Sequence, residues 1–170
     1  MTAAPTTSPT SPAPATPAVG PVPAAYRHAV VPHILVDDAV GALAFYERAF
    51  GAEPRFVLGG PEGEVTHAEI TVAGAVLMLG DARGDLRSPA SLGATPVIPH
   101  VHVPGVDALT DRATAAGATL LKAPADQFHG DRTAMLRAPY GHLWIFLTHL
   151  EDLTAEEIAR RLAETGGTSG

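Results

Sequence analysis

The side chains best suited to chemistry are histidines that fall in short apolar runs of the sequence. His33 follows Val31 by two positions in one run, and His100 and His102 follow Ile98 in another. Because side chains alternate between the two faces of a strand, each run predicts that its histidines share a face with that aliphatic residue. Imidazoles bind divalent metals and titrate near neutral pH, so these histidines could form a metal site or supply acid–base groups if the two faces converge. Histidines that are satisfied by hydrogen bonds, or that lie at exposed sheet edges, would have no chemical role.

A fourth histidine lies in a segment with strand-like alternation. The segment from Val65 to Val72 places His67 and Glu69 on one face and a largely apolar set on the other. We therefore expect His67 and Glu69 to extend the surface that carries the first three histidines.

Asp131 and Arg132 form a second candidate feature. A guanidinium binds a carboxylate or phosphate through two parallel hydrogen bonds, so Arg132 can act as an anion or substrate clamp. The structural alternative is that the pair holds a loop to the hairpin that follows. The residues themselves leave both interpretations open.

These residues begin a strand, turn and strand unit. We expect one arm over residues 131–137, a turn over Ala138-Pro139-Tyr140-Gly141, and a second arm over residues 142–149. Proline presets φ and glycine tolerates positive φ, so both are typical of a turn. Trp144 and Phe146 alternate with Ile145 in the second arm, which predicts that the two aromatic rings pack beneath helices.

Three sequences in this region, QFHGDR (127–132), PYGHLW (139–144) and TH (148–149), resemble the C-terminal signature of the PhnB-like branch of the vicinal oxygen chelate superfamily. That superfamily includes glyoxalase I, bleomycin-resistance proteins and extradiol dioxygenases. The resemblance covers roughly Val31 to Leu162. Two features depart from it, because Phe128 and His129 stand where the family more often carries tryptophan or another aromatic, and Ala138 stands where aspartate is usual.

The resemblance implies an α+β fold of paired βαβββ modules, which form an open, cup-shaped mixed sheet with helices on the outside. In this family, four side chains facing the cup, commonly His, Glu or Gln, hold a divalent metal that acts as a Lewis acid. The corresponding positions in this chain carry Val31, Met78, Ile98 and Ile145. None of these side chains ligates a hard or borderline divalent ion, so we expect no metal at the usual site.

Two functions from different classes follow from this resemblance. The first is a metal-independent protein whose apolar cup binds or sequesters a small organic molecule, as bleomycin-resistance relatives do. The second is an enzyme, a glyoxalase-like lyase or isomerase or a dioxygenase, with one divalent metal displaced toward His33, His100 and His102. No residue is assigned a catalytic role. The expected ligand contacts are His33, His67, Met78, His100, His102, Arg132 and Ile145.

The remaining pattern predicts two modules, over about residues 30–80 and 97–149. The helix end Gly51-Ala52 recurs 66 positions later as Gly117-Ala118, and the same offset matches Val40 with Val106. Further strands are expected at 30–36, 53–58, 65–72, 75–79, 97–103 and 119–122, and helices from Asp38 to Gly51 and over 106–116. Residues 80–96 are expected to form a loop that could serve as a mobile lid. Thr154 and Glu157 form a capping box for a last helix that runs through about Glu164.

Composition restricts the partners and the compartment. A net charge of −7 and a pI near 5.5 argue against nucleic acid or an anionic membrane as a partner. The absence of cysteine excludes disulfides and thiolate chemistry, and no apolar run approaches the roughly 18 residues of a spanning helix. We expect a cytoplasmic protein, and a homodimer, because the family often completes its pockets across a two-fold axis.

The ends of the chain differ in composition from the middle. Residues 1–25 consist mainly of Ala, Pro, Thr and Ser without any charged side chain, so we expect a disordered tail rather than a secretory signal. We assign the domain to residues 26–150, a C-terminal helix to 151–165 and a second disordered tail to 166–170.

Overall fold

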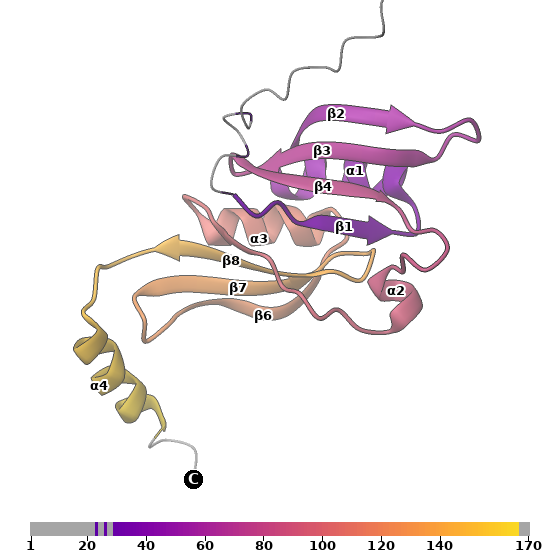
Figure 1. The fold of residues 1–170 in the computed structure, drawn as a ribbon. Helices are drawn as coiled ribbons and strands as arrows, with labels where there is room; N and C mark the ends of the chain where they lie inside the picture. Colours follow the sequence, from indigo (N-terminus) through magenta and orange to yellow (C-terminus); the bar gives the residue numbers. More distant parts are fainter. Residues whose placement is uncertain (1–22, 24–25, 27–28, 167–170) are drawn as a thin grey trace, which may run out of the picture.

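The computed structural model describes Pro23, Tyr26 and residues 29–166 of the chain (Figure 1). Both expected disordered tails lie almost entirely outside the described residues. The elements are β1 (His33–Val36), α1 (Ala39–Phe50), β2 (Glu53–Gly59), β3 (Val65–Val72), β4 (Ala75–Asp81), α2 (Pro89–Leu92), β5 (His100–His102), α3 (Val106–Ala115), β6 (Thr119–Asp126), β7 (Asp131–Arg137), β8 (Leu143–His149) and α4 (Ala155–Gly166).

Two four-stranded mixed sheets follow from these elements. Sheet one has the order β1-β4-β3-β2 and sheet two the order β5-β8-β7-β6, so both sheets are open and have two edge strands. β1 pairs in parallel with β4 and β5 pairs in parallel with β8, whereas the other strand pairs are antiparallel. The predicted α+β class, built from two βαβββ modules, is confirmed.

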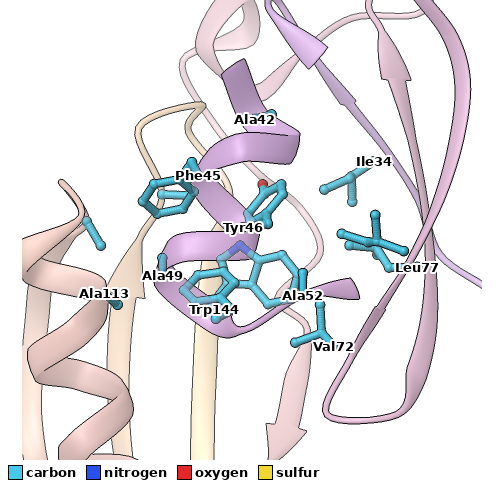
Figure 2. Close-up of a cluster of buried hydrophobic side chains, with 14 of the residues drawn as sticks. Ile34, Ala42, Phe45, Tyr46, Ala49, Ala52, Val72, Leu77, Ala113 and Trp144 are labelled. Carbon is cyan, nitrogen blue, oxygen red and sulfur yellow. The ribbon is translucent and has the colours of Figure 1, made fainter. Parts of the chain in front are cut away.

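The helices cover one face of each sheet and leave the other face open. α1 packs on sheet one and α3 packs on sheet two, and the two helices also contact each other. Figure 2 shows that α1 lies between Ile34 and Leu77 of sheet one and Trp144 of sheet two. One hydrophobic core therefore joins the two modules.

Aromatic rings form the centre of this core. Trp144 and Phe146 are fully buried, as predicted, and the Trp144 ring lies 5.1 Å from the Phe50 ring and 5.5 Å from the Tyr46 ring. The alternation of large rings on β8 thus fills the space beneath α1.

The predicted helix signals of the first module are confirmed. The Asp38 side chain accepts a hydrogen bond from the N–H of Gly41 at 2.8 Å, and Gly51 ends α1 in the left-handed conformation at φ 67°. The predicted match of Val40 with Val106 is wrong, because Val40 is 57% exposed whereas Val106 is buried. Ala39, the first residue of α1, is the buried counterpart of Val106.

Several strand bounds differ from the prediction for physical reasons. β1 and β5 begin at His33 and His100, later than expected, because Pro32 and Pro99 lack an N–H and contribute only their carbonyl groups to the sheets. β6 continues to Asp126 rather than ending at Lys122. In β3, an irregularity in the pairing with β2 near Gly59 interrupts the alternation, so that Val65 is buried together with Ala68, Ile70 and Val72.

The connection between the modules and the C-terminal segment also differ in detail. The expected loop over 80–96 begins inside β4 and contains α2, which Ser88 caps through a hydrogen bond from the N–H of Ser91. α4 begins at Ala155, where the Thr154 hydroxyl accepts from the N–H of Glu157 at 3.2 Å, and it continues to Gly166. None of the helices in the described part of the chain is long and apolar enough to cross a membrane.

Candidate functional site

The open face of sheet one, the side that α1 does not cover, carries one row of candidate residues across three strands. His33 on β1 is paired with Met78 on β4, and Met78 is paired with Glu69 on β3. The inner neighbours Ala68 and Ile70 are buried, so His67 and Glu69 lie on the open face as the alternation predicts.

An imidazole pair lies at the centre of this face. The rings of His33 and His67 meet edge to face with centroids 5.4 Å apart. Desolvation by neighbouring groups and the nearby His67 lower the pKa of His33 below its usual value. At neutral pH, His33 therefore offers a neutral ring that can accept or donate a hydrogen bond.

Glu69 connects the histidines to the edge of the sheet. Its carboxylate lies 3.8 Å from Nε2 of His67, accepts a hydrogen bond from the Tyr26 hydroxyl, and pairs with Arg55 at 3.4 Å. The Arg55 guanidinium also lies over the Tyr26 ring, 5.7 Å from its centroid. This set of contacts brings Tyr26, far away in sequence, onto the open face of sheet one.

The open face of sheet two repeats the same row. His100 on β5 is paired with Ile145 on β8, and Ile145 is paired with Met135 on β7. His100 and Ile145 stand 67 positions after His33 and Met78, so the two rows are equivalent in the two modules. A hollow of about 220 Å³ lies over this row, with Ile145, Met135, Thr133 and Lys122 among its lining residues.

A cluster of histidines and carboxylates lies at one end of this second face. Asp131 contacts His149 Nδ1 at 2.9 Å and His129 Nδ1 at 3.2 Å, and His149 Nε2 contacts Asp152 at 3.1 Å. The hydrogen bond from His149 lowers the pKa of Asp131, to which His129 and His102 add smaller electrostatic effects. Hydrogen bonds to Asp131 and Asp152 raise the pKa of His149.

Arg132 is engaged by carboxylates of its own chain. Its Nε and Nη2 donate to the two oxygens of Asp107 at 2.8 Å each, and its Nη1 donates to Asp126 at 2.7 Å. These contacts join α3, β6 and β7. They favour the structural interpretation of Arg132 over the anion clamp.

The positions that correspond to the family's metal ligands do not fit a metal. Met78 and Ile145 lie mid-strand on the two open faces, whereas Val31 and Ile98 lie just before β1 and β5. Three aliphatic groups and one thioether do not hold a hard or borderline divalent ion. Within the described part of the chain, no three side chains of His, Cys, Asp or Glu gather in a group able to hold a metal, so one copy does not unite His33, His100 and His102.

A larger apolar cavity adjoins the first row. It has a volume of about 490 Å³ and lies between β1 and the connection over residues 87–99, with His33, Leu35, Leu92 and Val97 among its lining residues. His142 forms part of its wall, and burial lowers the pKa of this imidazole to about 4. The connection expected to act as a lid thus forms one side of a cavity next to the candidate site.

Sequence reasoning did not find Tyr26, Arg55 or Phe56 as parts of the open face. Tyr26 follows a long segment without aromatic residues, which is the one signal that distinguishes it. Phe56 is paired with Glu69 across β2 and β3, and half of its surface is exposed, an unusual state for a large ring. These contacts depend on how β2 pairs with β3, which the sequence does not specify.

Comparison with known proteins agrees with this architecture. The model of the Glyoxalase/Bleomycin resistance protein/Dioxygenase superfamily matches residues 26–146. An uncharacterised protein of Mycobacterium bovis is 38% identical over 143 residues, which are 81% of this chain and 94% of that protein. An uncharacterised protein of Mycobacterium tuberculosis has the same identity over 84% of its length.

Solved structures share the fold. TioX from Micromonospora sp. ML1 superimposes with a TM-score of 0.59 at 27% identity, over 72% of this chain and 99% of TioX. The fosfomycin resistance protein FosX from Listeria monocytogenes, solved with Mn(II) and sulfate, has a TM-score of 0.52 at 20% identity, over 79% and 96% of the two chains. With the family model matched over most of the domain, the chain belongs to the glyoxalase/bleomycin resistance protein/dioxygenase superfamily.

Proposed function

We propose that this protein binds a small organic molecule between the open faces of its sheets and does so without the metal ion that many relatives use. The observation that carries this proposal is the chemistry of the four ligand positions. Val31, Met78, Ile98 and Ile145 replace metal-binding groups with aliphatic or thioether side chains, which suit an apolar ligand.

The proposed ligand contacts are the residues of the two rows and their neighbours. His33, His67 and Met78 contribute one half, and His100, His102 and Ile145 contribute the other. Arg132 remains an expected contact only through its exposed edge, because Asp107 and Asp126 occupy its nitrogen atoms. A neutral imidazole beside a thioether provides one hydrogen bond within a largely apolar surface, which is typical of small-molecule sites.

The site is proposed to be completed by a second copy of the chain. α1 lies between Ile34 and Leu77 of sheet one and Trp144 of sheet two (Figure 2), and we infer from this that the two open faces do not enclose one cavity within a single chain. A two-fold dimer that places sheet one of one copy opposite sheet two of the other supplies both halves of the site. The ligand then lies between the rows of His33 and His100.

The same arrangement favours one alternative function. In such a dimer, His33 of one copy can approach His100 and His102 of the other, and these groups form a displaced site for a divalent metal. The protein would then be a glyoxalase-like lyase or isomerase or a dioxygenase. The observation that favours this alternative is the equivalence of His33 and His100 in the two modules.

We further assign the chain to the PhnB-like branch and to the cytoplasm. The motifs QFHGDR, PYGHLW and TH support the branch. Asp131 of the first motif is in direct contact with His149 of the last, so this pair has a structural role in the fold. The acidic balance of the sequence, with a net charge of −7, is compatible with that compartment.

Metal content and oligomeric state test the proposal together. The full chain is purified without chelator, its bound metals are measured by plasma mass spectrometry, and its mass is measured by sedimentation velocity. We expect a dimer without stoichiometric metal, whose thermal midpoint rises with small organic ligands and not with zinc, nickel, manganese or iron(II). About one metal per chain, together with a metal-dependent activity that His100→Ala abolishes, would establish the alternative.

A further inference from the structure

Aromatic rings from four separate segments surround Met78 and Glu69 on the open face of sheet one. The His33 and His67 rings are 5.4 Å apart, and the Phe56 ring lies 6.3 Å from His67. Tyr26 reaches the same face through the hydrogen bond from its hydroxyl to Glu69. Rings at these separations interact through their faces and edges, and a planar ligand ring fits the same geometry.

The charges on this face are matched around the rings. Among the residues that the structure describes, Arg55 pairs with Glu69 and lies over Tyr26, so this carboxylate and this guanidinium neutralise each other. His33 is held neutral at physiological pH by desolvation and by its neighbour His67. A ligand beside these rings therefore meets matched charges on the described side chains, and a charged ligand would lose its hydration without a partner among them.

We propose that the open face of sheet one takes a planar, uncharged heteroaromatic ring and that Tyr26 acts there as a positioning residue. This inference rests on the proposed function and names its ligand class. The rings of Phe56 and His67 supply the wall, Met78 supplies a polarizable floor, and the neutral imidazole of His33 supplies a hydrogen bond to a ring nitrogen. Glu69 and Arg55 hold the Tyr26 side chain on this face.

The methionines allow each face to be observed separately. Met78 lies on the open face of sheet one and Met135 on that of sheet two. In full-length protein labelled with ¹³C at the methionine methyl groups, quinoline is titrated at about pH 8, where it is uncharged. We expect a saturable upfield shift of the Met78 methyl signal, because a ring stacked over the methyl group shields it. Quinoline-2-carboxylate and the saturated 2-decalol, of similar size, should bind at least about threefold more weakly.

Variants test the role of Tyr26. Tyr26→Ala removes the ring and should weaken quinoline binding about threefold to tenfold, whereas Tyr26→Phe keeps the ring but loses the hydrogen bond to Glu69 and should weaken binding less. Phe128→Ala is the matched control, since this ring contacts His129 outside the cluster, and it should bind quinoline as the wild type does.

The outcomes separate the two proposals. If none of the three probes shifts Met78 or Met135, the proposed function itself fails. If 2-decalol or quinoline-2-carboxylate binds as tightly as quinoline, or if only Met135 responds, the small-molecule function stands and the assigned ligand class is wrong. If Tyr26→Ala binds quinoline like the control variant, Tyr26 has no positioning role.

Discussion

Asp81 at the end of β4 and Thr148 near the end of β8 hold equivalent positions in the two modules. The Asp81 carboxylate accepts a hydrogen bond from the N–H of Ala39 at 2.7 Å, and the Thr148 hydroxyl accepts one from the N–H of Val106 at 2.8 Å. Ala39 and Val106 are the first residues of α1 and α3. Each module therefore fixes the start of its helix to its last strand, the same strand whose open face carries Met78 or Ile145.

Removal of these side chains should destabilise the protein unequally. Asp81 also accepts from the N–H of Val65 at 2.7 Å, so Asp81→Ala leaves two backbone donors without an ionised partner. Thr148→Ala leaves one donor and the carbonyl of Val103, to which the hydroxyl donates at 3.0 Å, and these bonds to a neutral group are the weaker ones. We expect the free energy of unfolding to fall by about 2 kcal/mol for Asp81→Ala and by about 1 kcal/mol for Thr148→Ala. Urea denaturation measures both, and Thr148→Ser should recover most of the loss. A larger loss at Thr148 than at Asp81 would contradict the hydrogen-bond account.

The imidazole pair on the open face predicts an unusual titration. The pKa of His33 is lowered, first by desolvation and second by His67. Histidine ring signals followed by NMR against pH should show His33 titrating below 6.5 in the wild type. In His67→Gln, we expect its pKa to recover only in part, because the larger cause remains. A lowered pKa means that the folded protein disfavours the charged imidazole. The contribution of His33 to stability should therefore be present at pH values above 6.5, the usual pKa of histidine, and should be lost as the pH falls through the folded pKa. Full recovery in His67→Gln would show that desolvation is not the main cause.

The contact between Asp131 and His149 predicts a pH window for stability. Asp131 and Asp152 raise the pKa of His149, so the contribution of His149 to stability is present below pH 6.5 and is lost as the pH rises through its folded pKa. His149 lowers the pKa of Asp131, so the contribution of Asp131 to stability is present above pH 3.8 and is lost as the pH falls through its folded pKa. Urea midpoints of the wild type and His149→Asn should therefore differ more at about pH 5.5 than at about pH 9.

A double-mutant cycle with Asp131→Asn separates this contact from other effects of the substitutions. The coupling between the two sites should be favourable at about pH 5.5 and decrease as the pH rises. A coupling that does not vary with pH would mean that the protonated imidazole is not involved.

Trp144 offers a test of the single core that joins the modules. It is buried against Tyr46 and Phe50 of the other module. Trp144→Ala should therefore lower the free energy of unfolding by about 3–5 kcal/mol, and Trp144→Phe by much less. Because the ring contacts both modules, the wild type should unfold in one transition by calorimetry. Two separate transitions, only one of them shifted by the substitution, would contradict a shared core.

The sequence was most informative where local signals agreed. Alternation placed Trp144 and Phe146 inside, Asp38 and Gly51 marked the two ends of α1, and the Pro139 to Gly141 turn separated β7 from β8. These features depend on contacts between neighbours in sequence or across one turn. The repeat of the two modules was predicted from the same kind of local signal, the helix end Gly51-Ala52 and its match Gly117-Ala118. At the start of the helices the predicted offset of 66 was too short by one residue, because α1 begins at Ala39 and α3 at Val106.

The arrangement of the candidate site was not predictable in the same way. Whether His33 approaches His100 depends on how the two modules pack, and the pattern of each strand contains no signal for that. The contact of Tyr26 with Glu69 joins residues 43 positions apart. Val31 and Ile98 fell outside β1 and β5 because each precedes a proline, an effect that apolar periodicity alone does not detect.

Substitutions at Arg132 and Asp107 can test whether Arg132 has a structural role or acts as an anion clamp. Its guanidinium donates two hydrogen bonds to Asp107 of α3 and one to Asp126 of β6, a geometry that lysine does not reproduce. Arg132→Lys should therefore lower the thermal midpoint, and Asp107→Asn should lower it in the same direction. A clamp would behave differently, because Arg132→Lys would weaken the binding of anionic ligands and Asp107→Asn would release the guanidinium and strengthen it. Binding of quinoline-2-carboxylate to the two variants, measured with the thermal midpoint on the same samples, decides between these roles.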